Sequence, residues 1–220
     1  MLACKPASTP VEVSHQLTPN TGKLLADPST YRRLVSRLLY FTVTWPDITY
    51  VVNLLSQFTS APCDMHWQAA LRVVRYLKRS PDLGILLSTH CSLKFHAYCD
   101  ANCASCPTTR RSTTGYCTFL GTNPLSWRTK KQRTVSRSSA EAEYRVMTNA
   151  ASEINWLQLL LSELDIPVHP PQLQCDNQAS IHIDNNPVFH ERTKHVEIDC
   201  HFVREKINDG TLCTTFVPSN

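Results

Sequence analysis

The sequence lacks an apolar run long enough to span a membrane, and its N-terminus lacks the basic-then-apolar pattern of a secretory signal peptide. Its ten cysteines are therefore expected to be reduced thiols rather than a disulfide framework. We expect an intracellular chain, cytoplasmic or nuclear, that is not secreted and has no membrane partner. At 220 residues, 42% of them hydrophobic, the chain is long enough for one good core or two small ones.

Acidic residues are also missing from one long stretch, Ala101 to Ala140. The same stretch is rich in Lys and Arg, and such a block of positive charge suits a phosphate backbone. A solvated hairpin whose basic side chains serve solubility is the alternative. We predict contacts with nucleic acid for Arg110, Arg111, Lys130, Lys131, Arg133 and Arg137.

Three carboxylates lie at the ends of predicted strands or near the start of a predicted helix. Asp100 ends an alternating run, residues 94–99, that is typical of a strand. Glu143 lies in the first turns of a long helical pattern, and Asp176 ends the apolar run 173–175. Carboxylates at two strand ends and on one helix face can converge on hard ions such as Mg²⁺, with Mn²⁺ as an alternative, and pairs of these ions cut phosphodiesters. The sequence therefore predicts a catalytic metal site at Asp100, Glu143 and Asp176.

The helical period distinguishes Glu143 from Glu141. At about 100° per residue, Glu143 falls near the middle of the apolar face, whereas Glu141 falls on the opposite side, where we expect solvent. A carboxylate on an apolar face is costly unless something such as a metal pairs with it. Glu141 instead completes a capping box with Ser138. The apolar face consists of Tyr144, Met147, Ala151, Ile154, Leu157 and Leu161.

The first part of the chain is predicted to be helical after an extended lead-in over residues 1–26. A helix begins at Asp27, a capping residue that is followed by Pro28. Two more helices are expected, and then a short strand; their ranges are 47–58, 64–78 and 85–87. This part contains no pair of adjacent aspartates of the kind that holds the metals of a polymerase palm.

The second part alternates strands and helices. The predicted order is three strands, a long helix, a strand, two helices and a last strand, over residues 94–100, 115–120, 125–128, 140–164, 173–176, 179–183, 196–208 and 211–217. Such an order gives an α/β fold with a mixed five-stranded sheet and flanking helices, as in ribonuclease H.

Motifs along nearly the whole chain resemble one family, the Pol polyproteins of Ty1/Copia-type retrotransposons, and they have a plant-like character. The matching segments are Lys5–Pro10, Tyr31–Val35, Pro46–Tyr50, Leu55–Phe58, Arg110–Gly121, Leu125–Trp127, Lys130–Gln132, Thr134–Ser139, Glu141–Tyr144, Asn186–His190 and Arg192–Asp199. The resemblance implies a reverse transcriptase thumb or connection remnant over 27–91 and a ribonuclease H-like domain over 92–220. It implies that the polymerase palm lies upstream of Met1.

The resemblance also implies residue roles. In this family the positions of Asp100, Glu143 and Asp176 are metal ligands, and the substrate is an RNA–DNA hybrid. His190 matches a mobile histidine that aids proton transfer or product release, although a locally bonded loop histidine is the alternative. Arg192 and Lys194 are expected at the nucleic-acid backbone. The upstream reverse transcriptase portion is the expected partner in the intact element.

Two departures from the family pattern lead us to expect weak cleavage or none. The family has a fourth acidic ligand on a helix after the fifth strand, and this sequence ends before it, as a truncated fragment would. Around Asp100 the family has Ser-Asp-Ala-Asp-Trp-Ala-Gly, whereas residues 99–105 read Cys-Asp-Ala-Asn-Cys-Ala-Ser. A noncatalytic nucleic-acid-binding or structural remnant is therefore the alternative to an endonuclease. An integrase-like core is a second alternative, disfavoured because an integrase has its Glu last.

Overall fold

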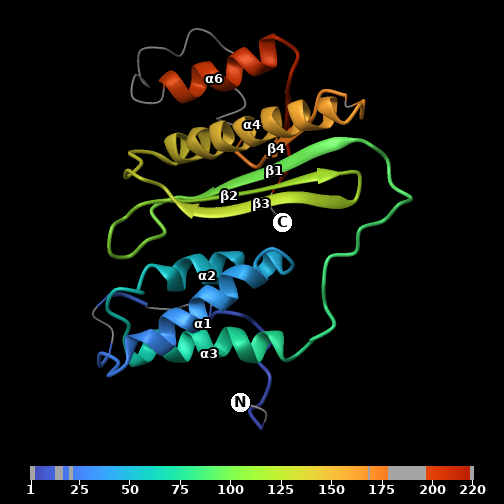
Figure 1. The fold of residues 1–220 in the computed structure, drawn as a ribbon. Coiled ribbons are helices and arrows are strands. Elements are labelled where there is room, and N and C mark those ends of the chain that lie inside the picture. Colours follow the sequence, from blue (N-terminus) through green and yellow to red (C-terminus); the bar gives the residue numbers. More distant parts are fainter. Residues whose placement is uncertain (1–2, 13–16, 20–21, 168, 178–196, 219–220) are drawn as a thin grey trace. The chain divides into compact units, whose positions relative to one another are not determined.

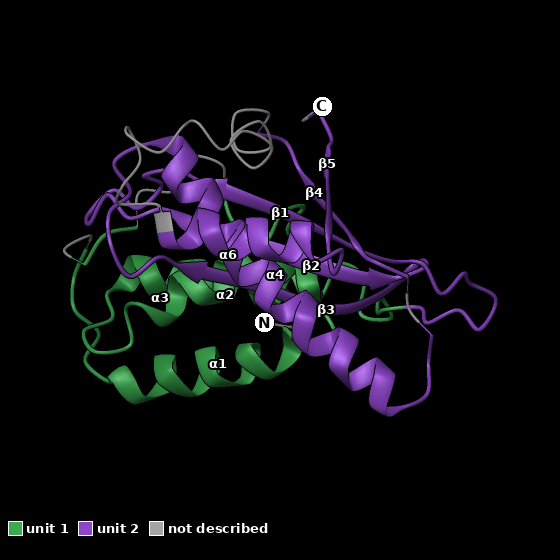
Figure 2. Ribbon diagram, turned by 90° about the horizontal axis from the view of Figure 1, so that it is seen from above, with its two compact units in different colours: residues 1–85 green, residues 86–220 purple. Residues whose placement is uncertain are grey.

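The computed structural model describes residues 3–12, 17–19, 22–167, 169–177 and 197–218. The chain divides into two compact units, residues 1–85 and 86–220 (Figures 1 and 2). The predicted strand at 85–87 is wrong, because these residues form no strand. Leu86 and Leu87 are instead exposed, since a three-residue apolar run without a partner strand has no ladder to join.

Unit 1 is built from three helices around one core. They are α1 (Pro28–Phe41), α2 (Thr49–Ser56), which follows a 3-10 turn over Pro46–Ile48, and α3 (Asp64–Leu77). The predicted start of α1 is confirmed, because the Asp27 side chain accepts a hydrogen bond of 3.0 Å from the Ser29 amide. The largest buried side chains of this core come from α1, the 3-10 turn and α2 and include Tyr31, Val35, Ile48, Val51 and Leu55.

The described parts of the lead-in, residues 1–26, pack against α3. Leu17 is buried in the unit 1 core. The Ala7 amide donates to the Arg75 carbonyl at 3.2 Å, and a ring nitrogen of the buried His66 lies 3.0 Å from the Thr18 carbonyl oxygen. The lead-in has no period in the sequence because it follows the surface of α3 irregularly.

Unit 2 contains a mixed five-stranded sheet in the order β3-β2-β1-β4-β5. Strands β1, β2 and β3 form an antiparallel meander. Strand β4 pairs in parallel with β1, and β5 pairs in parallel with β4. The predicted fold class, that of ribonuclease H, is thus confirmed. The strands are β1 (Phe95–Asn102), β2 (Thr113–Leu120), β3 (Asn123–Lys131), β4 (Gln172–Cys175) and β5 (Cys213–Phe216).

Helices α4 (Ser139–Glu163) and α6 (Glu197–Asn208) lie on one side of the sheet (Figure 1). The six apolar residues predicted for one face of α4 are all buried. All of them except Leu161 form the core of unit 2 with Phe95, Ala97 and Leu173 from the sheet and with Val203 from α6. The predicted short helix at 179–183 lies outside the described residues.

We expect substitutions on the buried side and on the exposed side of α4 to change the free energy of unfolding by very different amounts. Leu157 is 6% exposed and belongs to the core, whereas Leu159 on the same helix is 60% exposed. Leu157→Ala should lower the free energy of unfolding by about 2–4 kcal/mol, through lost burial and a cavity. Leu159→Ala should change it by less than about 0.5 kcal/mol. Urea unfolding of the full chain, followed by circular dichroism, measures both; equal losses would contradict this packing.

Candidate metal centre

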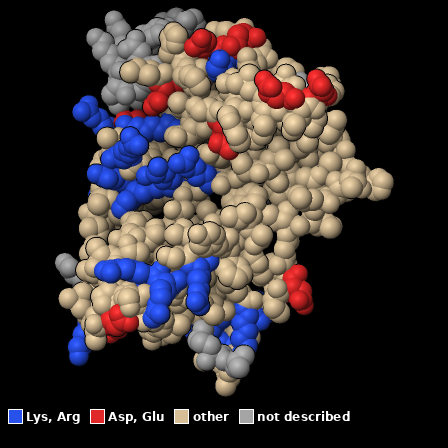
Figure 3. Space-filling view, in the orientation of Figure 1, with Lys and Arg blue, Asp and Glu red and all other residues tan. Residues whose placement is uncertain are grey.

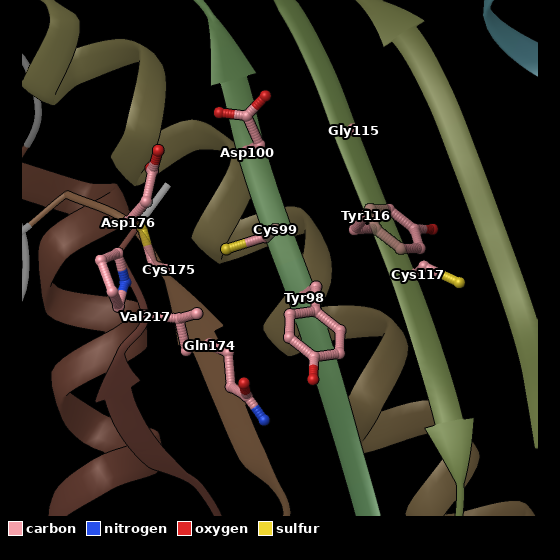
Figure 4. Close-up of a pocket in the computed structure, with 11 residues that line it drawn as sticks. Tyr98, Cys99, Asp100, Gly115, Tyr116, Cys117, Gln174, Cys175, Asp176 and Val217 are labelled. Carbon is pink, nitrogen blue, oxygen red and sulfur yellow. The ribbon is translucent and has the colours of Figure 1, made fainter. Parts of the chain in front are cut away.

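Two aspartates gather at the carboxyl ends of β1 and β4. These strands are parallel, and Cys99 is the register partner of Cys175. Each cysteine directly precedes one of the acids, so the pairing brings Asp100 and Asp176 to the same end of the sheet (Figure 4). One detail differs from the expectation: β1 continues for two residues beyond Asp100, to Asn102, because this segment still pairs with the start of β2.

Glu143 approaches the same place from α4. It is 5% exposed. Its Oε1 accepts a hydrogen bond of 3.3 Å from the amide of Ala101, and its Oε2 accepts one of 3.7 Å from the Cys175 thiol. The second turn of α4 therefore delivers a buried carboxylate to the ends of β1 and β4.

The acids approach the sheet end from both of its faces. Cys99 and Cys175 are buried on the helical side, whereas Asp100 is exposed. Candidate ligand atoms of Glu143, Cys175 and Asp176 all lie within 4.8 Å of one another. Asp100 is not in this group, but it lies near enough for its charge to raise the pKa of Glu143.

The electrostatics of this group favour a cation. Burial, the nearby Cys175 and the two aspartates raise the pKa of Glu143 to about 8, whereas the hydrogen bond from the Ala101 amide acts in the opposite direction. Burial and Asp176 also raise the pKa of Asp100. Desolvation and like charge thus penalise the ionised carboxylates, and a bound divalent cation would relieve both penalties. Oxygen donors of this kind fit Mg²⁺ or Mn²⁺.

The two sulfur atoms beneath the acids are hydrogen-bonded to each other. None of the ten cysteines forms a disulfide, and all ten lie within the described residues. A hydrogen bond between Cys99 and Cys175 lowers the pKa of the Cys175 thiol and raises that of Cys99. The sequence reasoning missed Cys175 as part of the site. The alternation of the run Leu173 to Cys175 could have revealed it, because it points both residues to the buried side.

The prediction that Glu141 is solvated is wrong. Glu141 is 3% exposed and forms a 2.6 Å ion pair with Arg145. It also accepts a hydrogen bond of 2.6 Å from the Arg137 amide, while its own amide donates to Ser138 Oγ at 3.1 Å. The segment before α4 folds back over the first turn, so the outer side of that turn is covered. Glu141 thus fixes the start of the helix.

Basic side chains line a hollow of about 420 Å³ between the end of β3 and α4. Figure 3 shows Lys and Arg gathered on this part of unit 2. Of the residues predicted to bind nucleic acid, Lys130, Lys131 and Arg133 line the hollow. The register places Lys130 across from Thr114 and Ala101, at the same end of the sheet as the acids.

The other predicted contact residues lie elsewhere. Arg110 and Arg111 are in the loop between β1 and β2, and Arg110 has a positive φ of 53°. Arg137 is exposed, just before α4. His190, Arg192 and Lys194 lie outside the described residues.

Comparison with known proteins places these features in a family, although no protein-family model matches the chain. The chain is 45% identical over 221 residues to the retrovirus-related Pol polyprotein from transposon RE2 of Arabidopsis thaliana, covering 100% of this chain and 15% of that protein. It is 33% identical over 230 residues to the Pol polyprotein from transposon TNT 1-94 of Nicotiana tabacum, covering 100% of this chain and 17% of that protein. The chain thus spans about a sixth of the length of these relatives.

A solved structure is similar in part. The ribonuclease H1 of Halobacterium salinarum NRC-1 has 16% sequence identity and a TM-score of 0.41, over 57% of this chain and 86% of that one. The family follows from the sequence relatives, which match over the whole of this chain. The chain belongs to the retrovirus-related Pol polyproteins of copia-type transposons and contributes a segment with a ribonuclease H-like fold.

Proposed function

We propose that unit 2 hydrolyses the RNA strand of RNA–DNA hybrids, weakly because of the two departures from the family pattern, with Asp100, Glu143 and Asp176 as ligands of Mg²⁺ or Mn²⁺. The observation that carries the proposal is Glu143, a buried carboxylate that faces two aspartates without an ion pair to any described Lys or Arg. Such a group is costly in a purely structural role and is suited to holding a divalent ion.

In this proposal the acidic residues bind the metal ions, and the basic residues bind the substrate. When bound, two divalent ions activate the attacking water and stabilise the leaving 3′ oxygen. Glu143 and the two aspartates supply anionic oxygens, and the Ala101 amide fixes the Glu143 carboxylate in place. Burial of Glu143 lowers the local dielectric, which strengthens its attraction for a cation. The basic hollow holds phosphates without reading base sequence.

Several parts of the proposal concern the rest of the molecule. Unit 1 would be a remnant of a reverse transcriptase thumb or connection, and the upstream reverse transcriptase portion would be its partner in the intact polyprotein. His190 would act near the metals, and Arg192 and Lys194 at the nucleic-acid backbone. The ten cysteines, which form no disulfide among the described residues, support an intracellular site of action. None of the described helices is long and apolar enough to cross a bilayer.

A noncatalytic nucleic-acid-binding domain is the second candidate. The basic hollow favours it, because Lys130, Lys131 and Arg133 can hold phosphates whether or not the acids bind metal. The two candidates agree on binding and differ on cleavage, so metal-dependent cleavage of a hybrid duplex separates them.

Glu143→Gln should abolish hybrid cleavage, whereas Glu163→Gln at the exposed end of the same helix should not. Loss of a ligand removes several kcal/mol of charge stabilisation, so we expect a fall in rate of more than about 100-fold. Cleavage of a labelled hybrid by the full chain in Mg²⁺ is the measurement. Binding of the hybrid without any cleavage by the unsubstituted chain would instead support the noncatalytic candidate.

The stability of the metal-free chain should depend on pH through Glu143. The folded chain holds this proton up to about pH 8, whereas the unfolded chain loses it near 4.5. Glu143 therefore does not lower the free energy of unfolding below about pH 4.5. As the pH rises from about 4.5 to about 8, its burial lowers the free energy of unfolding progressively. Glu143→Gln should be more stable than the unsubstituted chain at pH 8.5, by an amount that grows by up to about 1.4 kcal/mol per pH unit.

Urea unfolding in a chelator, at pH 5 and pH 8.5, measures that difference. Glu163→Gln serves as the control, with a difference that stays constant between the two pH values. A constant difference for Glu143→Gln as well would show that the folded chain does not hold the proton.

Hybrid binding should depend on salt through the hollow. Arg133 is exposed there, whereas Lys94 lies at the opposite end of the sheet, before β1. Arg133→Ala should weaken binding and reduce the slope of log affinity against log salt by about 1, the share of one phosphate contact. Lys94→Ala should leave the slope unchanged. Fluorescence anisotropy with a labelled hybrid, in a chelator to prevent cleavage, is the measurement; equal slopes for both variants would exclude the hollow.

A further inference from the structure

The centre contains a thiol among its carboxylates. Cys175 is buried, and its Sγ lies 3.7 Å from Glu143 Oε2. Asp176, the next residue, brings a carboxylate oxygen within 4.8 Å of this sulfur and of a carboxylate oxygen of Glu143. A sulfur atom offers nothing to Mg²⁺, which selects oxygen ligands in octahedral geometry. The thiol therefore changes which ions this place can hold.

The separation of Cys175 Sγ and Glu143 Oε2 matches that of two ligands on one tetrahedral ion. In a tetrahedral zinc site the Zn–S distance is about 2.3 Å and the Zn–O distance about 2.1 Å. Two such ligands at a tetrahedral angle are about 3.6 Å apart, close to the 3.7 Å between Cys175 Sγ and Glu143 Oε2. The same separation also suits the thiol hydrogen bond of the metal-free chain, so an ion can replace the thiol proton with little movement of these two atoms.

We propose that Cys175, Glu143 and Asp176 form a binding site for a thiophilic divalent cation of the Zn²⁺ class, overlapping the Mg²⁺ centre through the shared carboxylates. The inference rests on the proposed function for that overlap. Three protein ligands leave the fourth position of a tetrahedral ion open to water. Because one ion uses carboxylates that the other needs, Zn²⁺ competes with Mg²⁺ and inhibits the cleavage that Mg²⁺ supports.

The burial of two of the three ligands supports the site. Glu143 and Cys175 are 5% and 2% exposed, and both are held in place from neighbouring elements. The Ala101 amide holds the carboxylate, and Cys99 on the adjacent strand contacts the thiol. Ligands fixed in this way are oriented before the ion arrives, which favours tight binding.

Co²⁺ provides a probe that does not depend on activity, because a cobalt–thiolate bond gives a near-ultraviolet charge-transfer band and carboxylate ligands do not. We expect the full chain to develop this band on titration with Co²⁺ and to lose it on addition of Zn²⁺. Cys175→Ser should remove the band and weaken Zn²⁺ binding at least tenfold, roughly the lower end of effects seen when a metal site loses support. Cys200→Ser is the matched control, since Cys200 is also buried in the unit 2 core.

The outcomes separate this inference from the proposed function. A band that survives in Cys175→Ser, or a difference spectrum without a band, overturns the inference while Mg²⁺-dependent cleavage can persist. A Cys175-dependent band in a chain that never cleaves hybrids upholds the inference and removes the proposed function. If both hold, Zn²⁺ inhibits cleavage by the unsubstituted chain and inhibits Cys175→Ser at least tenfold less. Should Cys175→Ser lack a cooperative thermal transition, Cys175→Ala replaces it.

Discussion

The parallel pairing of β1 with β4 determines where the chemistry of unit 2 lies. Because Cys99 pairs with Cys175, two Cys-Asp dipeptides that are 76 positions apart in the sequence come side by side. Strand alternation then turns the two thiols toward the helical side, and the carboxylates occupy the end of the sheet. A shift of β4 by one residue in this register would exchange Cys175 and Asp176 between the faces and take the Cys175 thiol away from Glu143.

Helix α4 must supply one acid to that place without losing its own start. Two glutamates, two residues apart, do these different tasks. Glu143 faces the strands and has no basic partner among the described residues, whereas Glu141 is compensated by Arg145 and by the Arg137 amide. A buried carboxylate with a compensating cation is a stable structural element, and one without it invites a ligand. Burial alone therefore does not distinguish the two; the charge of the neighbours does.

The sequence predicted what depends on local pattern. The apolar face of α4 and the Asp27 cap follow from periodicity and from capping chemistry, and both agree with the structure. The burial of Glu141 could not be predicted, because it depends on a preceding segment that folds back over the helix. The extension of β1 beyond Asp100 depends on its partner strand, and the isolated run at 85–87 had none. The alternation of the run Leu173 to Cys175 indicates that Cys175 is buried, but its proximity to Glu143 depends on the strand register.

The proton on Glu143 links metal uptake to acidity. Near neutral pH the metal-free carboxyl is still largely protonated, since its pKa is about 8. Any ion that binds through this oxygen must displace that proton, so the apparent affinity for the ion falls by about tenfold for each pH unit below 8. Burial of Glu143 thus favours a cation at the site and also makes metal binding an exchange of the ion for a proton. This exchange takes place within the pH range of a cell.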